Sequence, residues 1–331
     1  MQERVYTLTA LTDIWTGSIS LREDKKGGSG QDSVQIVPDR LVTTGLLGSI
    51  RWWFEVLVRG LGGAPCGLDD EPDTRKEPDE PGHHCVVCEL FGCTGWARKF
   101  RFDVLAEDGK AQQNQITKDN PFRIRFTPLR PVRDEEWALL DLTLRLIADY
   151  GAIGGKTSLK PSGAKNPKRY FRPRNFGFVR IKHRPSVPRL TEYRLRAYVT
   201  DPRWRYPKQE GFSWASLDHV WCVKARYHAR QDRTKSTFNR VTEQPEKEWR
   251  SSHGDSRLAR RETGSEGDRE RKNVFSFKEP QAQRSFGFVR HPREFEATQQ
   301  LLREVWKDLR TDDFLTGDAI IRKLFDEGGN E

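Results

Sequence analysis

Two segments in the first half of the chain carry apolar residues at helical spacing. In the first, five apolar residues follow one another at intervals of three or four: Leu47, Ile50, Phe54, Leu57 and Leu61. They lie on one face of a helix, which we expect to be capped by Thr43 or Thr44 and to end at the glycines from Gly60 onward. The second predicted helix is Asp134–Tyr150, whose acidic start suits the positive end of the helix dipole.

Strands are predicted where apolar and polar residues alternate, or where β-forming residues gather. In the first half these segments are 5–12, 100–104, 122–126 and 176–181. Together with the two helices they give the order β-α-β-β-α-β. This is the pattern of the ferredoxin-like fold, which the RNA recognition module shares. We therefore predict a ferredoxin-like domain over residues 1–185.

The second half of the chain gives a weaker pattern. It predicts a strand at 193–199, a helix at 214–226, a strand at 284–290 and helices at 295–309 and 319–325. Residues 242–273 hold almost no apolar side chains, so we expect a polar loop that is disordered or ordered by a partner.

One segment of the second half repeats a segment of the first. Arg284–Arg290 reads RSFGFVR, and Arg174–Arg180 reads RNFGFVR. Two explanations of the repeat are open. One is chance similarity between two strands, and the other is a second, degenerate ferredoxin-like unit over residues 186–331. On the second explanation, the predicted fold class is α+β with tandem ferredoxin-like domains.

The charge balance favours a polyanionic partner. Of the 331 residues 32% are charged, and the net charge is +10. Each phosphate that a cation neutralises releases condensed counterions, so a basic excess favours nucleic acid, although a solvated basic surface has the same composition. The longest apolar runs are too short to span a bilayer, and Met1–Arg4 does not resemble a signal peptide. We therefore expect a cytoplasmic protein with no membrane partner.

The spacing of the cysteines predicts a metal site rather than disulfides. Cys85-x-x-Cys88 offers two thiolates at a spacing that surrounds one tetrahedral ion, and His83 and Cys66 are the candidate third and fourth ligands. Zinc suits such a set of sulfur and nitrogen ligands. His84 is the alternative third ligand, and free thiols in a turn are the alternative to any metal.

A zinc ion held in this way would be structural. Four protein ligands fill the coordination sphere and leave no open position for catalysis. The ion would order the base of a charged insertion at 62–97, to which it could contribute about 10 kcal/mol. We interpret the remaining cysteines, Cys93 and Cys222, as packed side chains.

Two short motifs carry a family resemblance. Gly48–Trp53 reads G-x-x-R-W-W, and Leu90–Gly92 reads L-F-G. This pair resembles the RAMP superfamily of CRISPR proteins, and within it the first RAMP subunit of type III-B (Cmr) effector complexes. Thr94–Phe100 is similar to a zinc-bearing branch of that family. The resemblance covers roughly the first 180 residues with recognisable motifs, and it implies tandem ferredoxin-like domains.

A basic segment follows the second predicted helix. Gly151–Ser158 resembles the glycine-rich loop of the family, and the insertion Leu159–Arg174 mixes cations with aromatic rings, the usual combination for single-stranded nucleic acid. A solvated basic loop is the alternative. An NTPase is disfavoured because Asp149 and Tyr150 stand where a Walker motif has its first glycine. The candidate RNA-binding residues are Arg51, Trp52, Arg98, Lys99, Lys156, Thr157, Ser158, Lys160, Lys165, Lys168, Arg169, Tyr170 and Arg172.

The resemblance implies a non-catalytic RNA-binding subunit of an antiviral type III-B complex. Such a subunit would contact the CRISPR guide RNA and its target RNA near the 3′ end of the guide, beside other RAMP subunits. The alternatives are an endoribonuclease that processes CRISPR RNA and a zinc-stabilised structural protein outside CRISPR. An endoribonuclease of this superfamily uses a histidine or lysine as general acid or base, and the histidines here are scattered without a recognisable pairing.

Overall fold

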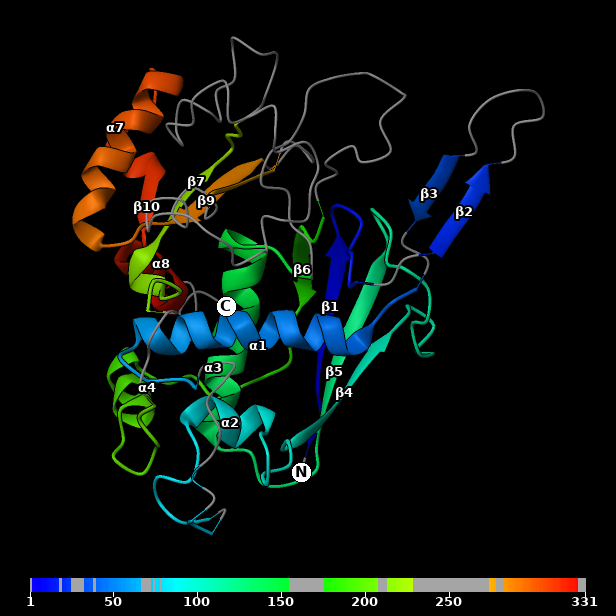
Figure 1. The fold of residues 1–331 in the computed structure, drawn as a ribbon, viewed down its shortest axis with the longest axis vertical. Helices are drawn as coiled ribbons and strands as arrows, with labels where there is room; N and C mark the ends of the chain where they lie inside the picture. The colour runs from blue at the N-terminus through cyan, green and yellow to red at the C-terminus, as the bar shows by residue number, and fades with distance from the viewer. Residues whose placement is uncertain are drawn as a thin grey trace.

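The computed structural model describes residues 2–17, 20–24, 33–37, 40–66, 73, 75–77, 79–154, 176–207, 213–228, 274–277 and 283–326. Its first sheet has four strands in the order β4-β5-β1-β6, and all neighbouring strands are antiparallel (Figure 1). The strands are β1 (Arg4–Ala10), β4 (Phe100–Leu105), β5 (Pro121–Pro128) and β6 (Val179–His183).

Two long helices connect these strands. Helix α1 (Thr43–Gly60) lies between β1 and β4 in the sequence, and α3 (Asp134–Tyr150) lies between β5 and β6. The paired strands β2 (Ser20–Asp24) and β3 (Ser33–Val37) and the short helix α2 (Val86–Phe91) are inserted between β1 and β4. The connectivity and strand order are those of a ferredoxin-like unit, which confirms the predicted pattern.

A second four-stranded antiparallel sheet has the order β10-β7-β9-β8. Counted along the chain within each unit, both sheets have the strand order 4-1-3-2, and α7 (Phe295–Val305) stands between the third and fourth strands here as α3 does in the first unit. The tandem α+β fold is thus confirmed. The strands are β7 (Val220–Lys224), β8 (Val274–Phe277), β9 (Arg284–Phe288) and β10 (Phe314–Thr316), with α4 (Glu192–Val199) before them and α8 (Gly317–Asp326) after them.

Two predictions for the second half were wrong. Residues 193–199, predicted as a strand, belong to helix α4, where Leu195, Tyr198 and Val199 are buried at helical spacing and Thr191 caps the first turn. Residues 214–226, predicted as a helix, hold one short turn (Leu217–His219) and strand β7. The first four residues of β7 are all buried, and a continuous apolar run of this length does not separate a core strand from a helix.

The repeated segment does not occupy equivalent positions in the two units. Arg284–Phe288 forms β9, the third strand of its unit, whereas Phe176–Phe178 precede β6, the fourth strand of the first unit. Residues 242–273, the predicted polar loop, lie outside the described residues. The first sheet falls within 1–185 and the second within 186–331, while the exact domain bounds stay a prediction.

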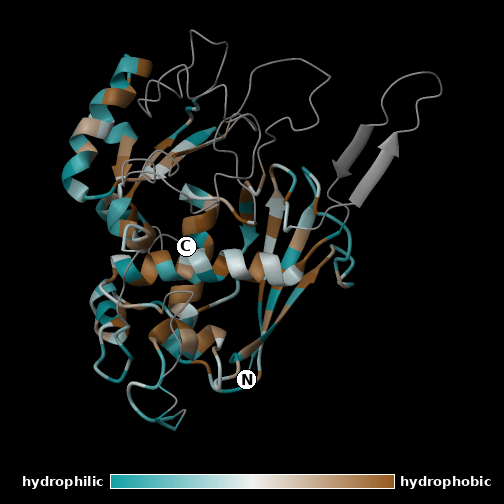
Figure 2. Cartoon of the chain, viewed as in Figure 1, coloured by the Kyte–Doolittle hydropathy of each residue, from teal (hydrophilic) through white to brown (hydrophobic). Residues whose placement is uncertain are grey.

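Helix α1 packs against both units. Ile50 and Phe54 are buried in the main core, and hydrophobic and hydrophilic residues alternate along the strands of the first sheet (Figure 2). On the other side, the ring of Trp53 lies 5.9 Å from that of Phe286 in β9, and the Arg59 Nη1 donates to the Ala215 carbonyl at 3.0 Å. The helix begins at Thr43 itself, with Val42 as its N-cap, so the predicted threonine caps were wrong. None of the helices in the described ranges has the length and apolar character needed to cross a membrane.

Candidate functional site

Three cysteines that are distant in the sequence meet beside helix α2. The Sγ atoms of Cys66, Cys85 and Cys88 all lie within 4.8 Å of one another, and all three residues are buried. Cys66 comes from the segment after α1, Cys85 is the N-cap of α2, and Cys88 lies in its first turn. The spacing of Cys85 and Cys88 places both sulfurs at one helix end, as a tetrahedral ion requires.

Hydrogen bonds converge on the sulfur of Cys85. Its Sγ accepts from the backbone N–H of Cys66 at 3.3 Å and of Cys88 at 3.5 Å. Burial alone would raise the pKa of the Cys85 thiol, but hydrogen bonds from Cys66 and Cys88 outweigh burial and hold the pKa well below its usual range. The hydrogen bond to Cys85 raises the pKa of Cys66 to about 12. One thiolate with two neighbouring thiols can bind a soft metal ion and release protons as it does so.

The predicted histidine ligand lies outside this group of three sulfurs. The Nδ1 of His83 is 2.9 Å from the Nδ1 of His84, and the Nε2 of His84 is 2.7 Å from the Glu89 carboxylate. The ring of His84 also stacks on Trp96, with 4.7 Å between centroids. Of the predicted ligand set, the structure therefore brings together Cys66, Cys85 and Cys88, and it pairs the histidines with each other.

Lys99, which we predicted as an RNA contact, is buried in an ion-pair network. Its Nζ lies 2.5 Å from the Glu89 carboxylate and 2.7 Å from the Glu136 carboxylate, and its side chain is 6% exposed. The Tyr198 hydroxyl donates to Glu136 at 3.0 Å. A lysine enclosed in this way cannot reach a phosphate, so this prediction is corrected: Lys99 joins the cysteine-bearing insertion to helices α3 and α4.

Arg51 also makes contacts within the protein. Its Nε donates to Glu55 at 3.1 Å, its Nη1 donates to the carbonyl of Gly92 at 3.0 Å, and its Nη2 donates to the Sγ of Cys88 at 3.5 Å. The side chain is 33% exposed. The structure thus places Arg51 at the cysteine cluster. The Nε of Arg98 donates to the Phe100 carbonyl at 2.7 Å.

Trp52 lines a cavity of about 240 Å³ between α1, the segment after α3 and the second sheet. The Oγ of Ser49 accepts from the N–H of Gly154 at 2.9 Å on its wall, and Trp53 donates from Nε1 to the Ala152 carbonyl at 2.8 Å. The aromatic side chains among its lining are those of Trp52, Trp53, Phe275 and Phe286.

This cavity lies where the basic segment leaves the described chain. Gly154 is the last described residue before that segment, and Phe176 is the first after it. Both ends are fixed, because Ile153 donates to the Gly177 carbonyl at 2.8 Å and Phe178 donates to the Thr12 Oγ1 at 3.0 Å. The other predicted RNA-binding residues lie outside the described residues: Lys156, Thr157, Ser158, Lys160, Lys165, Lys168, Arg169, Tyr170 and Arg172.

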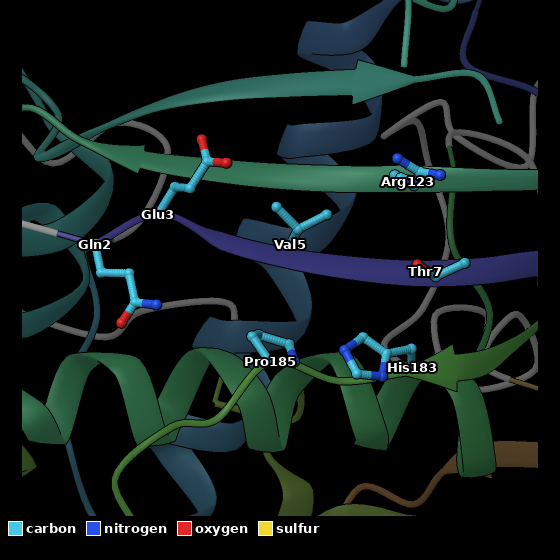
Figure 3. A pocket seen from close by; sticks show the side chains of 7 residues that line it. All are labelled: Gln2, Glu3, Val5, Thr7, Arg123, His183 and Pro185. Carbon is cyan, nitrogen blue, oxygen red and sulfur yellow. The ribbon is translucent and has the colours of Figure 1, made fainter. Parts of the chain in front are cut away.

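A second surface, which the sequence reasoning missed, is the face of the first sheet opposite helices α1 and α3. Figure 3 shows His183, Arg123 and Thr7 on this face. They line an open cavity of about 390 Å³. The register explains the grouping, because Thr7 pairs with Arg123 on one side and with His183 on the other. The sequence signal that could have identified this face is the alternation of Arg123 and Arg125 with buried apolar residues in β5.

The comparison with protein-family models agrees with the motifs. Residues 7–159 match the model of the RAMP superfamily. The crystal structure of Cmr1 from Pyrococcus furiosus in its apo form is similar over 99% of this chain and 97% of that chain, at 12% identity and a TM-score of 0.43. A Type IV-B CRISPR complex chain is similar over 60% of this chain and 100% of its own, at 15% identity and a TM-score of 0.37. None of the curated proteins matches. The matched region contains both the G-x-x-R-W-W and the L-F-G motifs, so residues 7–159 of this chain are similar to the RAMP superfamily.

Proposed function

We propose that this protein is a non-catalytic RNA-binding subunit of a CRISPR effector complex, of the type III-B (Cmr) kind. Its RAMP region, its tandem ferredoxin-like units and its net charge of +10 support this function. In the proposed complex it contacts the guide RNA and the target RNA near the 3′ end of the guide, next to other RAMP subunits in the cytoplasm.

The observation that carries the proposal is the meeting of Trp52 with Gly154 at one cavity. Gly154 leads directly into the segment that holds six lysines and arginines between 156 and 172. Cations that bind phosphates and aromatic faces that stack bases are the two components of a single-strand binding site. In this proposal the RNA strand follows the basic segment past the cavity, and Trp52 lies at the edge of the cavity.

We further propose that the three clustered cysteines hold a structural zinc ion. Three buried sulfurs within 4.8 Å of one another suit a tetrahedral thiolate site. Arg51 donates to the Sγ of Cys88, and Lys99 pairs with Glu89, the residue after Cys88. The ion therefore supports the fold of the insertion, and RNA binding takes place elsewhere.

A salt titration of RNA binding tests the proposed surface. A triple variant, Lys165→Ala with Lys168→Ala and Arg169→Ala, is compared with a matched triple variant at exposed cations of the second unit, Lys307→Ala with Arg322→Ala and Lys323→Ala. For single-stranded CRISPR RNA, each lost phosphate contact lowers the slope of log K against log salt by about 0.7. We expect a drop of about 2 for the first variant and little change for the second. Equal slopes for the two variants would refute the proposed surface.

A second candidate function is supported by His183 and Arg123, which flank Thr7 on the open face of the first sheet. A metal-independent endoribonuclease can use a histidine as general acid or base, and an arginine on the same face can bind a phosphate. Incubation of labelled CRISPR repeat RNA in the presence of a chelator separates the two functions. Cleavage that is lost in His183→Ala favours the nuclease, and intact RNA favours the non-catalytic subunit.

A further inference from the structure

We propose that Cys93 is the fourth ligand of the metal site, which makes it a four-thiolate zinc centre of Cys66, Cys85, Cys88 and Cys93, with Arg51 as a positioning residue outside it. The inference rests on the zinc role proposed above and replaces His83 in the predicted ligand set. It also reassigns Cys93, which the sequence led us to interpret as a packed side chain.

Cys93 lies next to the three sulfurs. Its side chain is in hydrogen-bonding contact with that of Cys88. The Cys93 Sγ is not within 4.8 Å of all three other sulfurs. Cys93 is half-buried, in contrast to the three buried cysteines. A rotation about its Cα–Cβ bond is therefore open to it, and such a rotation can bring the fourth sulfur toward the ion.

The backbone around Cys93 forms a tight turn that keeps it close to Cys88. Cys93 donates to the Trp96 carbonyl at 2.9 Å, and Trp96 donates back at 3.0 Å. Gly92 has a φ of +84°, and a Cβ there would lie 2.8 Å from the Arg98 nitrogen. Two glycines at positive φ, Gly92 and Gly95, thus allow the chain to bend sharply just after α2. A cysteine on such a turn, facing a Cys-x-x-Cys helix end, is well placed to close a tetrahedral site.

His83 is poorly placed for the same role. Its Nδ1 faces the Nδ1 of His84 at 2.9 Å. Its Nε2 faces the backbone of Gly95, 3.9 Å from where a Cβ on that glycine would lie. The Nδ1 of His83 is therefore paired with a neighbouring ring rather than with one of the three sulfurs.

The groups around the site can stabilise the charge of four thiolates. Four thiolates on Zn²⁺ leave a net charge of −2, which needs donors and a neighbouring cation. The backbone N–H groups of Cys66 and Cys88 donate to the Sγ of Cys85, and Arg51 donates from Nη2 to the Sγ of Cys88 at 3.5 Å. Such outer contacts orient metal ligands and stabilise their charge.

Metal analysis of the purified full chain tests the inference. We expect one zinc per chain in the wild type. Loss of an outer-shell partner lowers metal affinity by roughly 10–100-fold, and Cys93→Ser should lower the zinc affinity by at least as much. His83→Ala and the buried control Cys222→Ser should keep wild-type affinity. The Co²⁺-substituted wild type should show the thiolate charge-transfer absorption of four ligands, reduced in Cys93→Ser. Loss of zinc in His83→Ala with retention in Cys93→Ser would overturn the assignment, as would a wild type that binds no zinc.

Thiol alkylation of the wild type gives a second reading that needs no variant. Because Cys93 is the most exposed of the four cysteines, it should react first in chelator-treated protein and be protected in zinc-loaded protein. Equal labelling of Cys93 in both samples would refute its role as a ligand. RNA affinity is measured separately, so a failed zinc assignment remains distinguishable from a failed RNA-binding surface.

Discussion

Arg51 and Gly92 meet through a hydrogen bond of 3.0 Å from the guanidinium Nη1 to the carbonyl oxygen. Arg51 belongs to the G-x-x-R-W-W motif, and Gly92 ends the L-F-G motif, so the two motifs of the family resemblance form one contact. The same guanidinium reaches Glu55 and the Sγ of Cys88. Within the described residues, the arginine of the motif therefore joins α1, α2 and the cysteine cluster.

Arg51→Ala should lower the stability of the protein. The substitution leaves the Gly92 carbonyl and Glu55 without this donor, and each unsatisfied buried group costs about 1–3 kcal/mol. Denaturant unfolding measures the loss. Arg101→Ala is the matched control, because Arg101 is 57% exposed and surface substitutions usually stay within about 0.5 kcal/mol. Equal stabilities of the two variants would show that the Arg51 contacts contribute nothing.

Lys99→Met should destabilise the protein more strongly than it affects RNA binding. Removal of the cation leaves the buried carboxylates of Glu89 and Glu136 facing each other, and breaking a buried ion pair costs about 3–5 kcal/mol. The exposed Lys110→Met, with 86% of its side chain accessible, is the control. If Lys99→Met kept its unfolding midpoint but lost RNA affinity, Lys99 would return to the RNA-binding residues.

The stability of the protein should depend on pH through His228 in the second unit. Burial lowers the pKa of this imidazole to about 3, and its ring stacks on Trp306 at 4.3 Å between centroids. The unfolded chain has the ordinary histidine pKa of about 6.5, so below that pH the unfolded state binds a proton that the folded state does not. This contribution to stability is full above about pH 6.5 and falls by up to about 1.4 kcal/mol per pH unit as pH decreases toward 3.

His228→Phe keeps a stacking ring and removes the titration. Unfolding curves of the variant should therefore change less between about pH 7 and pH 5 than those of the wild type, a range in which most carboxylates stay ionised. Parallel curves for the two proteins over this range would argue against the neutral, buried histidine.

Two glycine substitutions should have opposite effects on stability. A Cβ at Gly48 in α1 meets nothing within 4 Å, so Gly48→Ala should stabilise the helix by about 0.5–1 kcal/mol. Gly177 has a φ of +81°, and a Cβ there would lie 1.8 Å from the Ile153 oxygen, so Gly177→Ala should cost at least about 1–3 kcal/mol. Thermal unfolding of both variants checks the pair. A destabilised Gly48→Ala would show that this motif glycine serves the fold.

The first unit was predictable because its signals are local. Asp134–Tyr150 combines an acidic start with apolar residues at helical spacing, and the helix has the predicted bounds. In β7, by contrast, Val220–Val223 are buried without alternation, because one face of the strand packs into the main core and the other into a second apolar cluster. Only the tertiary structure distinguishes this strand from a helix.

The side chains of the site were harder to assign than its position. The cluster of Cys66, Cys85 and Cys88 followed from their spacing. The burial of Lys99 could not be predicted from the sequence. Its partner Glu136 lies 37 residues away, and this carboxylate decides whether the lysine faces solvent. Sequence shows that a residue is charged, and only the fold shows where its countercharge lies.

The position of helix α1 determines whether the two halves of the protein can fold separately. Its Trp52 and Trp53 place their rings within 6 Å of Phe288 and Phe286, so the apolar interiors of the two units are continuous at this helix. A truncated chain that ends near residue 185 would expose these rings to water. The two halves are therefore inseparable in folding, and the protein should denature in a single cooperative transition.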